Sequence, residues 1–398
     1  MTAATDRDLD LVLFGATGFT GSLTAAYLAE AVSRKGGPAG LRWGLAGRDL
    51  TKLGDVRDRL AARFGLDPAA IELLRADVTD QASIDAVAAR TRVVITTVGP
   101  YLEYGEPVVR ACAEAGTDYV DLTGEPEFVD EMYVRYHAVA QRSGARIVHA
   151  CGFDSIPHDL GALFTAHQLG AAGPVRMRGV VRASGLASGG TFHSALGQFS
   201  RSSQMRAASA ARRQVEPRPQ GRRVRSVGGR PTRDPELGYW LLPLPTIDPV
   251  IVARSARELP VYGSDFTYSH YAGTKTLRYA VGGALTAVGL VAAAQIGPVR
   301  RWLGAKVPQG QGPDEARRAK SWFRVDFIAE GDGRKVHARV SGGDPGYTET
   351  AKMLAESGLC LALDDNPPTS GSVTTAVAMG AALTERLQRA GIRFEVLS

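Results

Sequence analysis

A glycine-spaced turn between an apolar run and a helical pattern constrains the fold of this chain most strongly. The stretch DLVLFGATGFTGSLTAAYLAE, residues 10–30, places Gly15, Gly18 and Gly21 three residues apart. The run 9–14 predicts a buried strand, and apolar residues at helical spacing predict a helix over 22–32. Glycine permits unusual backbone angles, close ligand approach and tight helix–strand packing at such a turn. Because a helix N-terminus offers unpaired N–H groups, the turn is suited to a diphosphate.

The turn opens a regular alternation of short apolar strands and helical patterns. Further strands are expected in RWGLAGRD, IELLRADVTD, TRVVITTVGPY, TDYVDLTGE and ARIVHACGFD, with helices over 49–64, 83–90, 106–115 and 127–143. Six strands separated by helices predict an α/β fold with a Rossmann-type doubly wound parallel sheet. We assign residues 1–152 to this domain.

The end of the second strand indicates which dinucleotide the turn would take. An NAD site usually carries an acid there to hold the ribose 2′-hydroxyl, whereas this chain has Arg48, whose guanidinium suits a 2′-phosphate. Asp49 is well placed to cap the next helix, so it does not restore an NAD site. NADP is therefore the expected cofactor. We expect the cofactor to contact Arg48, Asp77, Gly99 and Pro100, together with these residues of the glycine turn: Gly15, Thr17, Gly18, Phe19, Thr20 and Gly21.

Two other strand ends supply candidate residues. Asp77, at the end of the third strand, suits the adenine amino group, and a plain turn aspartate explains it equally well. The fourth strand runs into Gly99 and Pro100, whose sharp turn would aim Tyr101 or Tyr104 at the nicotinamide site. A neutral tyrosine hydroxyl can donate a hydrogen bond to a developing oxyanion or a proton to carbon. Ring packing is the alternative for both tyrosines.

The stretch GFDSIPHDLG follows the sixth strand and opens a helix. Asp154 and Ser155 followed by Pro157 are typical of a helix N-terminus, and capping explains the first two better than catalysis does. His158 lies in the first helical turn and has a pKa useful for proton transfer, so we count it as a third candidate catalytic residue. A structural role is the more common one for a lone histidine.

Several blocks together resemble the saccharopine dehydrogenase-like oxidoreductases. They are VLFGATGFTG, LAGRD, VGPYLEYGEPVVRAC, DLTGE, GFDSIPHDLG, SGGTFHSAL and the tail from 371 to 398, and their order covers nearly the whole chain. The resemblance is strongest to the branch with mycobacterial trans-acting enoyl reductases and animal lipid-droplet members. It implies that the nucleotide domain is followed by a substrate-contacting α/β domain with a mixed sheet over 153–345 and by C-terminal helices over 346–398 that return to the first domain. It also implies reduction of an acyl double bond on a polyketide synthase. The segment 205–236 departs from the pattern.

Composition points to an enzyme of the cytoplasm. With 44% hydrophobic residues over 398 positions, the chain can bury two cores. Its three cysteines are irregularly spaced, and no cysteine or histidine cluster has the spacing of a metal site, so neither a structural disulfide nor a metal is expected. The N-terminal MTAATDRDLD lacks the apolar core of a secretion signal.

Charge and hydropathy single out two segments of the second domain. Residues 201–233 hold ten arginines against one acid, Glu216, within a net charge of +6 for the chain, and predict a mobile basic loop over 201–236. An acidic acyl carrier protein or an anionic membrane surface would suit it, and nucleic acid is disfavoured because no aromatic residue interrupts it. A solvated loop without a dedicated partner is the alternative. Residues 279–299 carry no charge but are rich in glycine and alanine, which favours a packed or leaflet-dipping helix over a full membrane span.

These observations predict an NADPH-dependent reductase of an activated carbon–carbon double bond in a lipid or polyketide intermediate. Two alternatives stay open: a dehydrogenase of an amino acid or imine, and a non-catalytic NADP-binding protein at membranes or lipid bodies. The oligomeric state cannot be read from the sequence. Peripheral contact with the plasma membrane or lipid bodies would follow from the basic and apolar segments.

Overall fold

The computed structural model describes residues 7–38, 40–184, 201–278, 282, 289 and 313–398. These residues form two compact units. The first unit contains residues 7–152 and 347–386, and the second contains 153–346 and 387–398. The segment SGGTFHSAL and nearly all of the apolar stretch 279–299 lie outside the described residues. No helix in the described part of the chain is long and apolar enough to cross a membrane.

The first unit is built on a seven-stranded parallel sheet with the order β14-β6-β5-β4-β1-β2-β3. Its strands are short and mostly buried, as expected for a sheet covered on both faces. They are β1 (Leu9–Phe14), β2 (Trp43–Gly47), β3 (Ile71–Arg75), β4 (Thr91–Thr96), β5 (Asp118–Val120), β6 (Arg146–Val148) and β14 (Gly371–Val373). The predicted Rossmann-type sheet is confirmed, and a seventh strand from the C-terminal region extends it.

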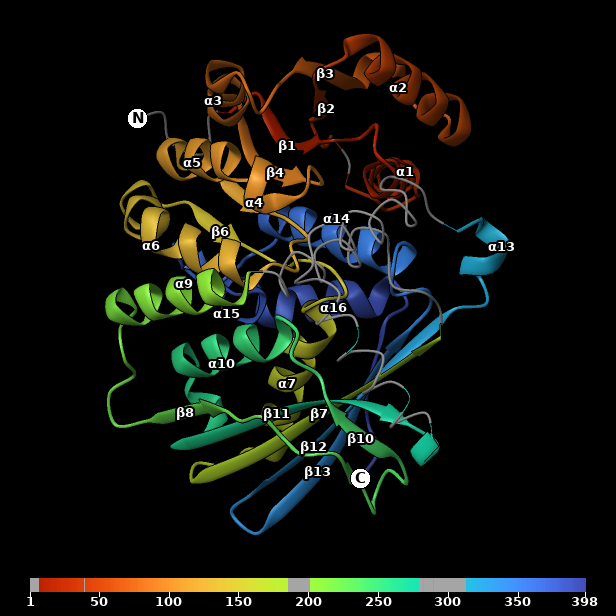
Figure 1. The fold of residues 1–398 in the computed structure, drawn as a ribbon. Coiled ribbons are helices and arrows are strands. Elements are labelled where there is room, and N and C mark those ends of the chain that lie inside the picture. The colour runs from red at the N-terminus through yellow and green to blue at the C-terminus, as the bar shows by residue number, and fades with distance from the viewer. Residues whose placement is uncertain (1–6, 39, 185–200, 279–281, 283–288, 290–312) are drawn as a thin grey trace. The chain divides into compact units, whose positions relative to one another are not determined.

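Helices cover both faces of this sheet (Figure 1). On one face α1 contacts α2 and α14, and on the other α5 contacts α3 and α6. A hydrogen bond of 2.6 Å from the Tyr27 hydroxyl to Glu356 ties α1 to α14, and Arg386 of α16 also pairs with Glu356. The helices of the unit are α1 (Phe19–Ser33), α2 (Leu50–Phe64), α3 (Gln81–Arg90), α4 (Tyr101–Tyr104), α5 (Glu106–Ala115), α6 (Pro126–Ser143), α14 (Thr348–Leu363), α15 (Thr375–Ala378) and α16 (Gly380–Arg389).

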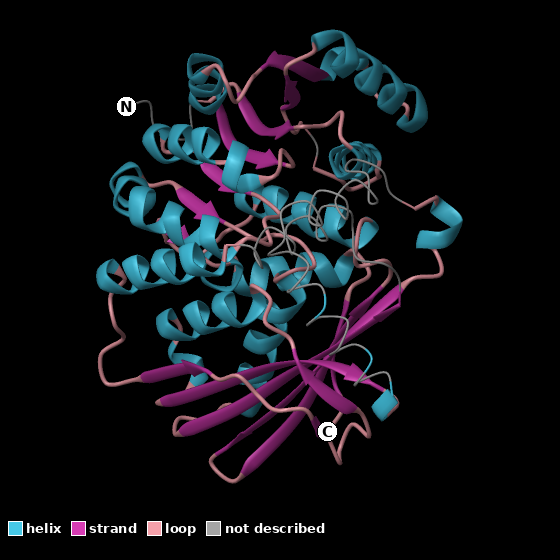
Figure 2. Cartoon of the chain, in the orientation of Figure 1, coloured by secondary structure: helices cyan, strands magenta, loops and turns pink. Residues whose placement is uncertain are grey.

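The second unit has an eight-stranded mixed sheet, shown in magenta in the lower part of Figure 2. Its order is β15-β13-β12-β7-β11-β10-β9, with β8 paired to β11. The strands are β7 (Pro174–Ser184), β8 (Arg223–Ser226), β9 (Thr232–Arg233), β10 (Trp240–Pro243), β11 (Asp265–Thr274), β12 (Trp322–Gly331), β13 (Arg334–Gly342) and β15 (Arg393–Val396). Helix α7 (Ile156–Leu169) packs on β12 and β13, and α10 (Asp248–Glu258) packs on β11.

The end of the chain differs from the prediction that residues 346–398 form helices of the first domain. Residues 347–386 belong to the first unit, but the last twelve residues belong to the second. There β15 pairs antiparallel with β13, with Phe394 opposite Val340. Phe394 is buried, so four residues of alternating polarity are stabilised as an edge strand by the sheet beside them.

The basic segment 201–236 is also not the mobile loop that its composition predicted. It forms α9 (Ser202–Val215) followed by β8 and β9. Glu216 lies among Arg212, Arg254 and Arg257, and the guanidinium of Arg222 donates to backbone carbonyls near the end of α10. Many of these arginines therefore have structural partners, which composition alone does not reveal.

Candidate functional site

The glycine turn connects β1 to α1 with the geometry that its spacing predicts. Gly15 adopts a φ of +97°, which residues with a side chain rarely take. A Cβ on Gly21 would lie 2.1 Å from the Gly15 carbonyl oxygen, so only glycine fits there. At Gly18 a Cβ would meet the same oxygen at 3.5 Å, an ordinary contact. Gly15 and Gly21 thus serve the turn itself, while Gly18 leaves its outer side open to a ligand.

The start of α1 is free of competing anionic side chains. Gly18 is the N-cap residue, makes no side-chain cap, and is followed by no acid in the first turn. The Thr97 hydroxyl donates to the carbonyls of Phe14 and Gly15, which ties the end of β4 to the turn. The ring of Tyr347 packs edge-on against Phe19, with centroids 4.9 Å apart. The turn is therefore preorganised, and its helix N-terminus suits a diphosphate.

The ends of β2 and β3 present a basic surface beside this turn. Arg48 is exposed directly after β2, and Asp49 caps α2 by accepting from the Lys52 N–H, as predicted. Hydrogen bonds from Thr79 lower the pKa of Asp77, and the charges of Arg48 and Arg75 lower it further. Asp77 is thus held by its own turn. Sequence reasoning missed Arg75, which the parallel register places opposite Gly47 at the same sheet edge.

Tyr101 is buried and serves to connect loops. It is 6% exposed, its hydroxyl donates to the Thr96 carbonyl at 3.0 Å, and it accepts from the Leu122 N–H at 3.4 Å. Burial raises the pKa of this hydroxyl well above its ordinary value. These contacts tie the end of β4 to the end of β5 and favour the packing alternative for Tyr101.

Tyr104 lies at the end of α4 and is accessible. Its side chain is among the exposed large apolar ones, with 39% of its surface accessible. The preceding Gly99–Pro100 peptide bond is cis, and Pro100 is the N-cap of α4. Of the two tyrosines after β4, Tyr104 is the one that a ligand can reach. A catalytic role for either remains a prediction.

A buried network at the ends of β5 and β6 was not anticipated from the sequence. Asp121 accepts a hydrogen bond from the Tyr119 hydroxyl at 2.9 Å and lies 2.7 Å from Nδ1 of His149. It also accepts from the backbone N–H of Ala150, whose φ of +60° is unusual for a residue with a side chain. In open parallel sheets, ligands bind beyond the carboxyl ends of the strands. This network holds two of those ends in place.

His158 lies in the second unit, in a buried cluster rather than in the glycine-turn region of the first unit. Its Nδ1 is 2.9 Å from Oδ1 of Asp248, and its ring packs against that of His270 with centroids 5.0 Å apart. Burial and the charge of Asp248 raise the pKa of Asp154 to about 6. Ser155 occupies the N-cap of α7, but its hydroxyl donates to the Asp154 carbonyl instead of capping the helix.

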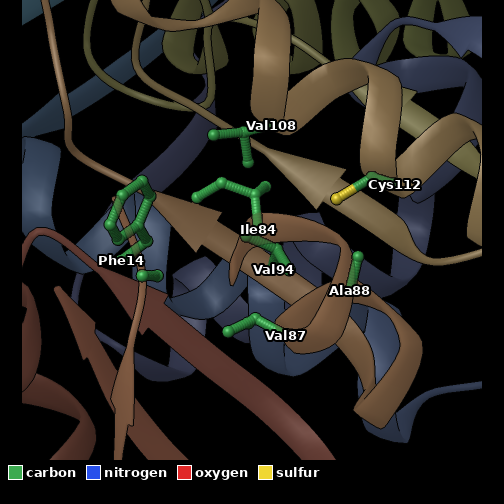
Figure 3. A pocket seen from close by; sticks show the side chains of 8 residues that line it. Phe14, Ile84, Val87, Ala88, Val94, Val108 and Cys112 are labelled. Atoms are coloured by element: carbon green, nitrogen blue, oxygen red, sulfur yellow. The ribbon is translucent and has the colours of Figure 1, made fainter. Parts of the chain in front are cut away.

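A small apolar cavity lies between the sheet of the first unit and helices α3 and α5 (Figure 3). Its walls are aliphatic and aromatic side chains together with one cysteine, from Phe14, Ala76, Ile84, Val87, Ala88, Val94, Val108 and Cys112. Burial raises the pKa of the Cys112 thiol, so this cysteine is an unreactive core residue. The cavity is a gap in packing and offers a ligand no polar contact.

Comparison with known proteins agrees with these features. Residues 11–148 match the model of the saccharopine dehydrogenase NADP binding domain. A Mycobacterium tuberculosis protein provisionally named a trans-acting enoyl reductase is 39% identical over 98% of both chains. The trans-acting enoyl reductase of Mycobacterium bovis is 35% identical over 97% of both. The solved apo saccharopine dehydrogenase (L-Glu forming) of Saccharomyces cerevisiae covers 98% of this chain and 99% of its own, with a TM-score of 0.53 and 13% identity, which is a likeness of fold.

The parallel sheet, its glycine turn and the matching domain model define an NADP-binding oxidoreductase. The exposed Arg48 and the open helix N-terminus fit that cofactor, as predicted. The chain belongs to the saccharopine dehydrogenase-like family, among relatives that are named trans-acting enoyl reductases.

Proposed function

We propose that this protein is a trans-acting enoyl reductase that reduces a carbon–carbon double bond of a lipid or polyketide acyl intermediate. The observation that carries the proposal is 39% identity to a relative so named, over 98% of both chains. Sequence conservation of this extent over both units covers the substrate domain as well as the cofactor domain. The nucleotide-binding turn by itself would suit many reductases, because a fold hosts many activities.

Bound NADPH would supply the hydride for the β-carbon of the acyl chain, and a proton from solvent water would be added at the α-carbon to complete the reduction. The glycine turn would hold its diphosphate, and Arg48, with Arg75 beside it, would hold the 2′-phosphate. Tyr104 is the exposed hydroxyl after β4, so we assign it the hydrogen bond to the enolate oxygen that develops as the double bond is reduced. Tyr101 and the Asp121–His149 pair would keep the surrounding loops in position.

An activity assay with purified protein tests the reaction. We expect NADPH oxidation with 2-enoyl thioesters and none with an amine plus a keto acid. Tyr104→Phe should lower kcat by roughly 10²- to 10³-fold, the cost of losing one oxyanion donor. Tyr136→Phe is the matched control, because it removes a tyrosine hydroxyl that pairs with Glu106 on the neighbouring helix. Turnover of imines alone would favour the amino-acid dehydrogenase alternative, and cofactor binding without any turnover would favour the non-catalytic one.

We further propose that the acyl substrate arrives on an acidic carrier protein that docks on α9. Arg206 and Arg213 are exposed on this helix, and positive charge attracts an acidic partner over long range. The double variant Arg206→Glu/Arg213→Glu should raise KM for a carrier-bound substrate and leave KM for a short free thioester unchanged. An equal change in KM for both substrates would contradict a docking role for α9. If the same variant still binds lipid vesicles, the effect on KM comes from carrier docking and not from membrane contact.

A further inference from the structure

Three buried side chains from separate elements of the second unit converge on one point. His158 lies in the first turn of α7, Asp248 is the first residue of α10, and His270 lies on β11. Their exposed fractions are 2%, 3% and 4%. One nitrogen or oxygen from each lies within 4.8 Å of the others. Three elements thus bring two imidazoles and a carboxylate together away from solvent.

Several polar atoms in this cluster lack a hydrogen bond to any other described residue. Both ring nitrogens of His158, Oδ1 of Asp248 and Nε2 of His270 are buried without a hydrogen-bond partner among the described residues. The contact of 2.9 Å between His158 Nδ1 and Asp248 Oδ1 is an ion-pair distance that lacks hydrogen-bond geometry. Buried polar groups in proteins are nearly always paired. Four buried atoms without a hydrogen bond at one point therefore indicate a binding function.

We propose that His158, Asp248 and His270 form a binding site for a divalent transition metal, with Zn²⁺ as the ion that this ligand set suits. Two imidazole nitrogens and one carboxylate oxygen are a common zinc ligand set. At ligand distances of about 2.0–2.2 Å, tetrahedral geometry places ligand atoms about 3.4 Å apart, which small side-chain rotations can reach here. Three protein ligands leave a fourth coordination position open.

Neighbouring groups orient two of the ligands for this role. The Tyr268 hydroxyl lies 3.2 Å from Nδ1 of His270, which leaves Nε2 to bind the metal. The Thr246 hydroxyl donates to Oδ2 of Asp248, which leaves Oδ1 for the metal.

The inference is independent of the proposed reduction, because its test requires neither NADPH nor an enoyl substrate. Full-length protein is freed of metal with a chelator and titrated with Zn²⁺ by calorimetry, and with Co²⁺ by visible absorption. We expect one equivalent of each ion and the d–d bands of a four-coordinate Co²⁺ centre. His270→Gln and Asp248→Asn should each weaken Zn²⁺ binding by roughly 100-fold or more, and Tyr268→Phe by about 10-fold.

His167→Gln is the matched control, because His167 is an exposed histidine on the same helix as His158. It should bind Zn²⁺ as the unaltered protein does. Circular dichroism shows whether each variant is folded. If the variants of the ligand residues do not fold, Tyr268→Phe still tests the site, because it alters a neighbour of a ligand and not a ligand itself. Failure of the unaltered protein to bind either ion would overturn the proposal. So would Zn²⁺ binding that His270→Gln leaves intact, and in both cases the cluster would be a buried ion pair that supports the fold.

Discussion

Alanine substitutions at three glycines should separate the role of the turn from the role of the cofactor. A Cβ on Gly21 would lie 2.1 Å from the Gly15 carbonyl and 2.7 Å from the Thr97 hydroxyl. Backbone must move to relieve the first contact, and overpacking of this kind costs about 1–3 kcal/mol of unfolding free energy. Gly21→Ala should therefore lose both stability and NADPH affinity.

Gly18→Ala should affect binding alone. Its Cβ would meet the Gly15 carbonyl at an ordinary 3.5 Å, and its φ of −76° is open to any residue. The fold should be retained, whereas the methyl group stands where the diphosphate approaches the backbone. Loss of one charge-assisted hydrogen bond of about 1.5–3 kcal/mol would weaken NADPH roughly 10- to 150-fold.

Gly54→Ala is the control within the same unit. It lies inside α2, and the new Cβ would meet only a Leu73 methyl at 3.9 Å. Replacing a mid-helix glycine should stabilise the protein by about 0.5–1 kcal/mol and leave NADPH binding unchanged. Urea unfolding and calorimetric titration measure both quantities. The reasoning would be refuted if Gly18→Ala bound NADPH with the affinity of the unaltered protein, or if Gly21→Ala had the same free energy of unfolding as the unaltered protein.

Three further predictions concern charged groups of the first unit. Arg48→Ala should weaken NADPH binding by roughly 10- to 150-fold in calorimetry and leave NADH binding unchanged, with Lys52→Ala as the control. An equal loss of affinity for both nucleotides would argue against a 2′-phosphate contact. Asp10 accepts hydrogen bonds from the Arg42 backbone and guanidinium, and these outweigh burial to lower its pKa, so Asp10→Asn should cost about 1–3 kcal/mol at neutral pH. That cost is present above the unfolded pKa of about 3.9 and should shrink as pH falls below it; urea midpoints that differ equally at neutral and acid pH would contradict this. Arg7 donates to three backbone carbonyls and the Thr117 hydroxyl. Arg7→Leu should therefore lower the free energy of unfolding by about 1–3 kcal/mol for each buried acceptor that loses its donor, and a total loss below about 1 kcal/mol would show that water replaces these bonds.

Local patterns were sufficient to predict the six N-terminal strands of the first unit. The strand–glycine–helix order, the caps at Asp49 and the C-terminal glycines of several helices act within a few residues, so they are readable without tertiary structure. The suitability of Arg48 for a 2′-phosphate likewise follows from its position at the end of a strand. For these reasons the doubly wound parallel sheet and the preference for NADP could be anticipated.

Composition was a poor guide where distant partners decide the structure. The arginines of 201–236 predicted a mobile loop. Instead, Arg212 pairs with Glu216 and Arg222 donates to carbonyls near the end of α10, and sequence spacing does not encode these contacts. Residues 393–396 are too short to form a strand alone, and they are extended because they pair with the edge of β13.

The same distinction applies to the sites. The sequence alone determined the diphosphate turn, because its three glycines are close together in the chain and two of them, Gly15 and Gly21, are required by local sterics. Only the tertiary structure decided that Tyr101 is buried among strand ends, that Asp121 pairs with His149, and that His158 meets Asp248 and His270. These residues come from separate elements, and burial in a common core, rather than spacing along the chain, brings their side chains together.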